Sequence, residues 1–451
     1  MKPAQFDRRT LLRRAAIAGA TIPALGAALA PASGRRVAAA DPVTLEFWTP
    51  ANDPVGSGII TKLVDGFNSS VGQEKGIHVN ARIKPIPDNG DYVQYTTAMT
   101  SSGSPDVVMT YVYDPVASWA ANGFLRPMDD YVQAVGIKED DFFPIAWSMI
   151  DFGGHFWGLL QEFDFNQFWT NTAVHAGDPP KTFDELDALA AKYNKFDDDG
   201  NLVQAGLIPW MRFQGRDWNA VWGGNFYDLD NRKWTIDTPE NQKFLEWFVK
   251  HADLLGGREK SDALESSVPR TYGDIFQYGK VVFALEGEYL PAELKKQGLD
   301  LQYRIDHLPT ADGIPYGTAT TGGGNLFLLP TNAKHPDEAA VFIQYMGSKE
   351  GSLNWCLPNS NIPPVKAAAL DPSFQEQLPE LKPWIDALQV NHMMPPSPSP
   401  QYATFVQLSN TMIDEVTYKK KTPAQALADV AAKIADEVGQ FKEAHPDWQG
   451  E

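Results

Sequence analysis

Short apolar segments alternate with segments of helical periodicity in the first third of this 451-residue chain. Residues 43–48 and 77–83 alternate apolar and polar side chains, as half-buried strands do. Residues 59–67 and 92–99 carry apolar side chains at helical spacing, and residues 106–110 form an apolar run bounded by turn residues. Strand, helix, strand, helix, strand at this spacing predicts βαβ units and a parallel sheet, so the chain is expected to be α/β.

Helix-start signals and two apolar runs extend this pattern toward the C-terminus. Thr182 and Glu185 have the spacing of a capping box, and Thr238 before Pro239 is typical of a helix start. We expect further strands at residues 154–160 and 281–285, further helices at residues 337–346 and 423–441, and a stiff surface loop in the proline-rich segment 395–400.

Residues 1–40 have the order of regions found in an export signal. The pair Arg8-Arg9 lies in a basic segment, an apolar segment follows at residues 15–30, and Ala38-Ala39-Ala40 provides a cleavage site. This order predicts a twin-arginine signal rather than an ordinary secretory signal. Cleavage would leave 31 basic and 56 acidic residues, a formal charge of −25. That charge disfavours nucleic acid and anionic lipid as partners.

Length and cysteine content set two further limits. About 410 residues after cleavage is long for one core and suggests two domains. The one cysteine, Cys356, cannot form an intramolecular disulfide, and it lies far from the cleavage site that a lipid-bearing cysteine would follow.

Motifs for metal, phosphate or nucleophilic chemistry are not found. The eight histidines are scattered, and residues 197–201 miss the calcium-loop spacing because Lys195 and Gly206 fall at ligand positions. Residues 322–325 are Gly-Gly-Gly-Asn without the Lys-Ser/Thr of a phosphate loop, so a close-packed turn is expected there. The carboxylate pair of a glycosidase cannot be singled out among so many acidic residues. We therefore expect no metal and no cofactor.

Aromatic and polar side chains gather just after several expected strands. In open α/β sheets, ligands bind beyond the carboxyl ends of the strands, so these side chains are candidates for a binding site. Aromatic rings offer flat apolar faces to a sugar ring, while carboxylates, amides and arginines bind its hydroxyl groups. The candidates are Trp48, Asp53, Tyr111, Tyr113, Asp114, Glu162, Asp164, Trp210, Arg212, Trp218, Trp222, Glu286, Glu288 and Tyr289.

Several segments, taken in order, resemble the family 1 extracellular solute-binding proteins, the carbohydrate-type receptors of ABC importers. Each segment is short, and the resemblance rests on their order and spacing over nearly the whole chain after residue 40. They include LEFW at 45–48, SPDVV at 104–108, GKVVFALEG at 279–287, GGG at 322–324 and NIPP at 361–364.

The resemblance implies a two-lobed periplasmic-binding-protein fold, type II-like, with mixed, mostly parallel sheets flanked by helices. Mapped onto this chain, lobe one would comprise residues 41–163 and 311–361, and lobe two residues 168–306 and 371–451. Three hinge crossings would lie near residues 163–167, 306–310 and 362–370.

The resemblance also bears on the site. It implies that Tyr289 stacks on a sugar, although Glu288 holds the place often taken by tryptophan. Gly323, Asn325 and Asn361, which lie in or beside the matching segments, join the candidate ligand-binding residues.

The leading hypothesis is a monomeric, non-catalytic periplasmic receptor that captures a sugar or oligosaccharide and delivers it to membrane ABC permease subunits. A receptor for a glycerol-phosphate ester or polyol is an alternative, for which Arg212, Arg216 and Arg270 could bind an anion. Two further hypotheses are a secreted carbohydrate-acting enzyme and a scaffold or adhesin. The enzyme predicts turnover, and the scaffold predicts no small-molecule pocket.

Overall fold

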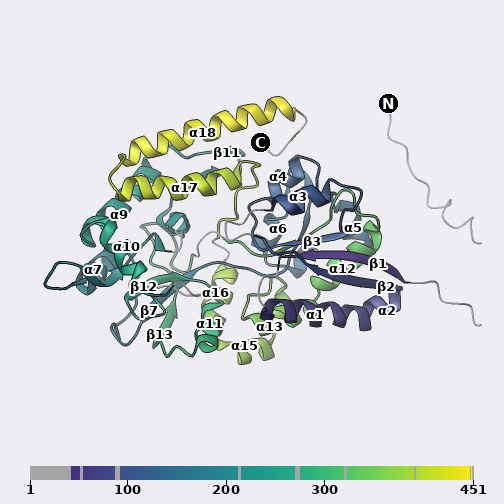
Figure 1. The fold of residues 1–451 in the computed structure, drawn as a ribbon, viewed down its shortest axis with the longest axis horizontal. Helices are drawn as coiled ribbons and strands as arrows, with labels where there is room; N and C mark the ends of the chain where they lie inside the picture. Colours follow the sequence, from purple (N-terminus) through teal and green to yellow (C-terminus); the bar gives the residue numbers. More distant parts are fainter. Residues whose placement is uncertain are drawn as a thin grey trace, which may run out of the picture. The chain divides into compact units, whose positions relative to one another are not determined.

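Two five-stranded sheets organise the part of the chain that this computed structural model describes (Figure 1). The expected signal, residues 1–40, lies outside the described residues, as do the candidates Asp53 and Arg212 and the alternative anion contact Arg270. The described residues are 42–50, 54–86, 92–211, 215–269, 275–318, 322–390, 393–446 and 448.

The first sheet has the strand order β2-β1-β3-β14-β6. Its strands are β1 (Val43–Thr49), β2 (Ile77–Ile83), β3 (Val107–Thr110), β6 (Gly158–Leu160) and β14 (Leu326–Leu328). β1 pairs in parallel with β2 and β3, while β14 runs antiparallel between β3 and β6. All four residues of β3 are buried, as the apolar run in the sequence predicts for a strand covered on both faces. Helices α1 (Pro54–Ser69), α2 (Val71–Lys75) and α12 (Pro336–Met346) pack on these strands.

The second sheet has the order β13-β7-β12-β9-β8. Its strands are β7 (Gln167–Asn171), β8 (Lys195–Phe196), β9 (Leu202–Leu207), β12 (Val281–Glu286) and β13 (Tyr303–Asp306). Only the pair β12 and β9 is parallel here. The α/β class is therefore confirmed, with a larger antiparallel share than the mostly parallel sheets expected from the sequence. The flanking helices are α7 (Phe183–Tyr193), α9 (Pro239–Leu254), α10 (Arg258–Ser266), α11 (Leu290–Gln297), α16 (Lys382–Val390), α17 (Tyr402–Thr417) and α18 (Pro423–Ala444).

Shorter elements connect these layers, and one of them corrects an expectation. The strand expected over residues 154–160 is split at Trp157, because residues 155–156 pair with residues 151–152 in a small hairpin, whereas residues 158–160 pair with β14 in the first sheet. The connecting elements are α3 (Val93–Met99), α4 (Val116–Ala121), α5 (Asp129–Val135), α6 (Pro144–Ser148), β4 (Asp151–Phe152), β5 (His155–Phe156), α8 (Trp218–Trp222), β10 (Tyr227–Asp228), β11 (Lys233–Trp234), α13 (Lys349–Asn359), α14 (Lys366–Ala369) and α15 (Pro372–Gln377).

Three segments that are far apart in the sequence meet where the chain passes from the first sheet to the second. Residues 161–166 join β6 to β7. The Phe163 N–H donates to the Ile362 carbonyl oxygen (2.8 Å), and Asp164 and Gly323 exchange two backbone hydrogen bonds (2.8 and 3.1 Å). The close packing expected for the glycine segment 322–324 is confirmed here. The lobe and hinge boundaries themselves stay a prediction.

The capping box at the start of α7 is present and supplies a stability test. The Thr182 hydroxyl accepts from the Glu185 N–H (3.2 Å), and the Glu185 carboxylate accepts from the Thr182 N–H (3.3 Å). Replacing Thr182 with alanine leaves a helix N–H without its partner, so we expect a loss of about 1 kcal/mol in the free energy of unfolding. Urea unfolding measures it. Thr182→Ser should keep most of the stability, and equal losses in both variants would contradict the capping explanation.

Candidate functional site

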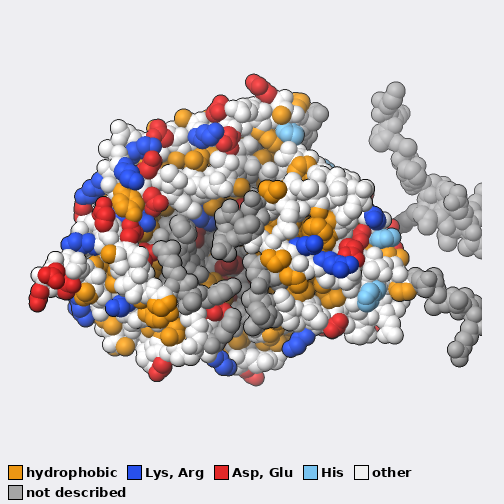
Figure 2. Space-filling model, in the orientation of Figure 1, with side chains coloured by type: hydrophobic (Ala, Val, Ile, Leu, Met, Phe, Trp, Pro, Cys, Tyr) orange, Lys and Arg blue, Asp and Glu red, His pale blue; other side chains and the backbone are white. Residues whose placement is uncertain are grey.

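A cavity of about 190 Å³ lies beside the place where these segments meet. Six residues expected from the sequence line it, namely Tyr111, Tyr113, Asp114, Asp164, Tyr289 and Gly323. Other residues of its wall are Val112, Phe165, Asn166, Arg216, Asp217, Gly322, Gly324, Pro396 and Tyr402. Figure 2 shows that the surface of this face is hollowed near its middle, with acidic side chains visible inside the hollow.

Strand ends position most of these side chains. Residues 111–114 directly follow β3 in the first sheet, and Tyr289 follows β12 in the second. Residues 164–166 join the two sheets, and Gly322–Gly324 precede β14. The cavity therefore lies at the ends of strands from both sheets, as expected for an open α/β sheet.

Arg216 is the centre of the polar part of the wall. Its Nε lies 3.7 Å from Asp217 Oδ1, and its guanidinium donates to the Tyr402 hydroxyl. Asn166 Nδ2 donates to the other carboxylate oxygen of Asp217 (3.0 Å). Burial raises the pKa of Asp217 to about 6, although the charge of Arg216 opposes the rise. Burial also raises the pKa of Asp114, again against the influence of Arg216. The wall thus offers both donors and acceptors in a partly desolvated setting.

Tyrosine rings form the apolar part of the wall. Tyr289 is half-buried, and its ring lies against Gly287, where a β-carbon would come within 2.3 Å of the ring. Tyr113 and Tyr402 meet edge to face with ring centroids 5.9 Å apart. The Tyr113 hydroxyl is buried without a hydrogen-bond partner among the described residues. A bound molecule with a hydroxyl group could supply that partner.

Four further candidates form a buried layer behind the cavity. The Trp355 indole N–H donates to the Glu162 carboxylate, which also receives a hydrogen bond from Asn325, and Asn361 Nδ2 donates to Glu288 Oε1 (3.0 Å). Burial raises the pKa of Glu162 to about 8, and the charge of Asp164 adds to the rise. Burial, then repulsion from Asp164 and Glu162, raises the pKa of Glu288 well above its ordinary range. These residues support the wall and do not line the cavity.

The remaining described candidates lie elsewhere in the core. Trp218 and Trp222 pack with Phe183 and Trp247, and the Trp218 indole N–H donates to the Pro209 carbonyl oxygen (3.1 Å). The Trp210 ring packs on Phe248 and under the Arg258 guanidinium. None of the three lines the described part of the cavity wall.

Trp48 and Glu286 also stand apart from the cavity. Lys84 Nζ lies 4.7 Å from the Trp48 ring centroid, and Tyr95 meets that ring edge-on. Glu286 is fully buried on β12, where its carbonyl oxygen accepts from the Trp169 indole N–H (3.1 Å).

Asp217, Pro396 and Tyr402 are among the wall residues that were not candidates from the sequence. The expected proline-rich surface loop is wrong, because Ser397 and Ser399 are buried and Pro396 faces the cavity. The Ser399 hydroxyl accepts from the Trp234 indole N–H (3.2 Å) and donates to Gln401, so the serines between the prolines turn inward. The one local signal that could have indicated a buried segment is the alternation of serine and proline just before α17, which begins with Tyr402.

Metal binding and membrane spanning find no support in the described part of the chain. Among those residues, no group of three or more histidine, cysteine or acidic side chains is placed to hold a metal ion. The described helices also include none with the length and apolar character needed to cross a bilayer.

Residues 62–383 match the family of bacterial extracellular solute-binding proteins. Because the match covers more than half of the chain, the protein belongs to this family. A relative is the maltotriose-binding protein of Pyrococcus abyssi, which is 23% identical over 305 residues. The aligned region covers 67% of this chain and 63% of that protein, so the chain spans less than two thirds of that relative.

Solved structures confirm the two-lobed fold expected from the sequence. The protein CpMnBP1 with mannotriose bound superposes with a TM-score of 0.74 at 23% identity, over 86% of this chain and 99% of that one. A cyclo/maltodextrin-binding protein complexed with maltotetraose superposes with a TM-score of 0.68 at 21% identity, over 89% of this chain and 98% of that one. At these sequence identities, the structural similarity is evidence for the fold alone.

Proposed function

We propose that this protein is the substrate-binding component of an ABC importer and captures a neutral sugar or oligosaccharide in the cavity. The observation that carries this proposal is the meeting of tyrosine rings with carboxylate, amide and guanidinium groups in one wall. Tyr111, Tyr289 and Tyr402 offer ring faces, and Asp164 and Asn166 offer hydrogen bonds to hydroxyl groups. The names of the relatives, which bind maltotriose, mannotriose and maltotetraose, point to the same ligand class.

The same wall disfavours an anionic ligand such as a glycerol-phosphate ester. Arg216 is the cation of the described wall, and it shares that wall with Asp114, Asp164 and Asp217. A phosphate group in this cavity would face more carboxyl groups than guanidinium groups, so we expect net repulsion. A neutral ligand uses both kinds of group as hydrogen-bond partners without that cost.

The wall residues come from both sheets, and this arrangement bears on how a ligand is captured and delivered. Residues after β3 and residues after β12 belong to different sheets, so a ligand between them gains contacts from both only when both approach it. Such a ligand favours the closed arrangement by the free energy of those extra contacts. We further propose export by the twin-arginine route, a periplasmic, unanchored monomer, and delivery to membrane permease subunits.

A thermal-shift screen of the purified protein tests the proposal. The panel comprises maltotriose, mannotriose, cellotriose, triacetylchitotriose, glycerophosphodiesters and polyols, with product analysis of every hit. A ligand at 100 times its dissociation constant adds about 2.7 kcal/mol to stability, which raises the melting temperature measurably. A shift with the sugar unchanged supports the receptor, a shift with the sugar consumed supports the enzyme, and no shift with any sugar overturns the carbohydrate proposal.

Tyr289→Ala is expected to weaken binding of the sugar found in that screen by about 10- to 100-fold. The variant removes a ring face from the cavity wall, and loss of a buried aromatic contact with a ligand costs about 1–3 kcal/mol. Calorimetric titration gives the change. The matched control is Tyr316→Ala, because Tyr316 is 40% exposed and lies outside the wall. Equal weakening in both variants would remove Tyr289 from the site.

A further inference from the structure

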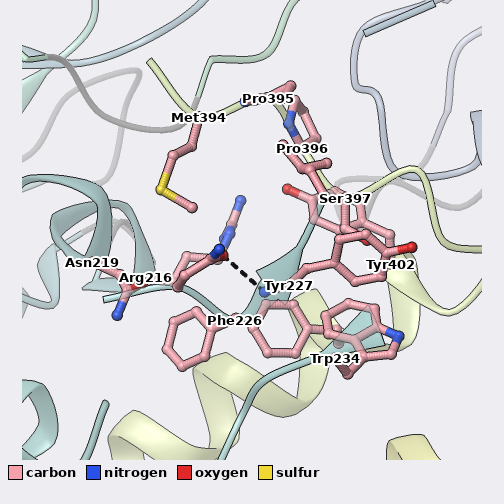
Figure 3. Close-up of a pocket in the computed structure, with 13 residues that line it drawn as sticks. Arg216, Asn219, Phe226, Tyr227, Trp234, Met394, Pro395, Pro396, Ser397 and Tyr402 are labelled. Atoms are coloured by element: carbon pink, nitrogen blue, oxygen red, sulfur yellow. Dashed lines mark hydrogen bonds between the residues drawn. The ribbon is translucent and has the colours of Figure 1, made fainter. Parts of the chain in front are cut away.

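A second, smaller pocket adjoins the sugar cavity and shares part of its wall. Its volume is about 50 Å³, and Arg216, Pro396 and Tyr402 line both spaces. Figure 3 shows Met394, Pro395 and Pro396 on one side of this pocket and the rings of Phe226, Tyr227 and Trp234 on the other, with Arg216 between them. The two spaces therefore adjoin at these three side chains, and this border is where a group attached to a ligand in the cavity would enter the pocket.

Size limits what the pocket can hold. A space of this kind needs roughly 10–15 Å³ for one water molecule, so about 50 Å³ holds a group of a few heavy atoms. The neighbouring cavity is about four times larger by the same measure. The small pocket therefore excludes another sugar ring and admits a short substituent.

The walls are mainly apolar, and several of their aromatic rings are fixed by contacts with one another. Trp234 packs on Phe405 with ring centroids 4.8 Å apart, and Phe226 packs on Phe405 at 5.1 Å. The Trp234 indole N–H is already used by Ser399, so the ring offers its apolar surface. Such walls favour a methyl group over a hydroxyl group, because a buried hydroxyl without a partner costs free energy.

Polar groups at the rim are suited to an amide carbonyl. Asn225 is exposed, and its side-chain oxygen accepts from the Tyr227 N–H (2.9 Å). Its Nδ2 is a donor with no partner among the described residues. Arg216 adds N–H donors at the boundary between the two spaces. A carbonyl oxygen at the mouth and a methyl group inside would satisfy both features.

We propose that the sugar captured by this protein carries an acetamido group, and that this small pocket binds it. The inference rests on the proposed sugar-receptor function and specifies its substrate class as N-acetylated sugars. The acetyl methyl lies against Trp234 and Phe226, and the acetyl carbonyl oxygen accepts from Asn225 or Arg216. A hydroxyl at the same position of the sugar leaves the aromatic pocket unfilled, and an ammonium group would be desolvated against rings and a guanidinium.

Calorimetric titration with three matched trisaccharides tests the inference. Triacetylchitotriose, cellotriose and fully deacetylated chitotriose share one backbone and linkage and differ at carbon 2. We expect the acetylated sugar to bind at least about tenfold more tightly than the other two, the lower end of what one buried apolar group gives. If it binds no more tightly than cellotriose, the inference is wrong.

The same titrations separate this inference from the proposed function. If cellotriose binds in these titrations, or maltotriose or mannotriose binds in the thermal-shift screen, and acetylation brings no gain, the receptor function stands and the acetamido pocket is rejected. If none of the saccharides binds, the sugar-receptor proposal fails and the inference fails with it.

A pair of leucine variants locates the preference in the pocket. Leu229 lies at the pocket rim and is 40% exposed, whereas Leu370 is 44% exposed and lies outside the pocket wall. Leu229→Trp should fill the pocket and reduce the preference for the acetylated sugar to below about threefold. The preference is calculated against the cellotriose affinity of the same variant, so a general loss of binding is not counted as a loss of preference. Leu370→Trp should leave the preference unchanged, and an unchanged preference in Leu229→Trp would overturn the assignment.

Discussion

Gly324→Ala is expected to destabilise the protein severely. A β-carbon at this position would lie 1.9 Å from the Glu162 carbonyl oxygen and 3.0 Å from Leu160 Cδ1. The first of these atoms belongs to the backbone that joins the two sheets, so it cannot move aside as a side chain would. The backbone φ of +148° adds strain for any residue other than glycine. We expect a loss of about 4 kcal/mol or more in the free energy of unfolding.

The neighbouring glycine is the matched control. A β-carbon on Gly323 would lie 3.4 Å from the Asp164 carbonyl oxygen, an ordinary contact distance. Gly323→Ala should therefore keep its urea midpoint close to that of the parent protein, even if sugar affinity changes, because Gly323 lines the cavity. If Gly324→Ala yields too little folded protein for urea unfolding, the soluble yields of the two variants are compared instead. Equal midpoints in the two variants would show that the segments do not pack as closely as described.

Local signals in the sequence predicted individual elements well. The alternation at residues 77–83 and the continuous apolar run before residue 110 became β2 and β3, and the Thr182 capping box begins α7. Each of these signals depends only on side chains a few residues apart, so a short segment of sequence is enough to recognise it. β7 and β13 were not predicted, because neither shows a clear alternation of apolar and polar side chains between turn residues. β7 is stabilised by pairing with β12 and β13, and both of these strands are distant from it in the sequence.

The candidate site was predicted in part for the same reason. Tyr113 and Tyr289 directly follow β3 and β12, and the rule for open α/β sheets placed them correctly at the cavity. Trp218 and Trp222 are also close together in sequence, but helix α8 turns them into the core against Phe183. A cluster of tryptophans alone does not distinguish a core from a sugar-binding surface.

Long-range contacts explain the residues that were missed. Tyr402 reaches the cavity because its hydroxyl receives a hydrogen bond from Arg216, which is 186 positions earlier in the sequence. Nothing in the sequence near either residue indicates that contact. The acidic layer behind the cavity is similar, since Glu162 and Glu288 meet partners from residues 355–361. Pairing of this kind is a property of the folded chain.

Glu162→Gln is expected to make the protein more stable than its parent at alkaline pH and to change little at acid pH. Burial raises the pKa of Glu162 from an ordinary value of 4.5 to about 8. A carboxyl group with a raised pKa binds its proton more tightly when folded, so the stability that depends on it is complete below pH 4.5. That stability is lost as the pH rises toward 8. Glutamine is neutral at every pH, and its side-chain oxygen can still accept from the Trp355 indole N–H.

The difference between variant and parent should therefore grow with pH by about 1.4 kcal/mol per unit between pH 5.5 and 7.5. Urea unfolding at several pH values measures it. The free energy of unfolding of the variant should still fall somewhat with pH, because Glu288 remains in the variant. The pKa of Glu288 is also raised, by burial and by the charges of Asp164 and Glu162. Glu376→Gln, at an exposed carboxyl group on α15, is the control and should follow the parent at every pH. If Glu162→Gln also parallels the parent, the Glu162 carboxyl is ionised in the folded protein, and the buried layer behind the cavity must be stabilised by a cation or solvent that compensates its charge.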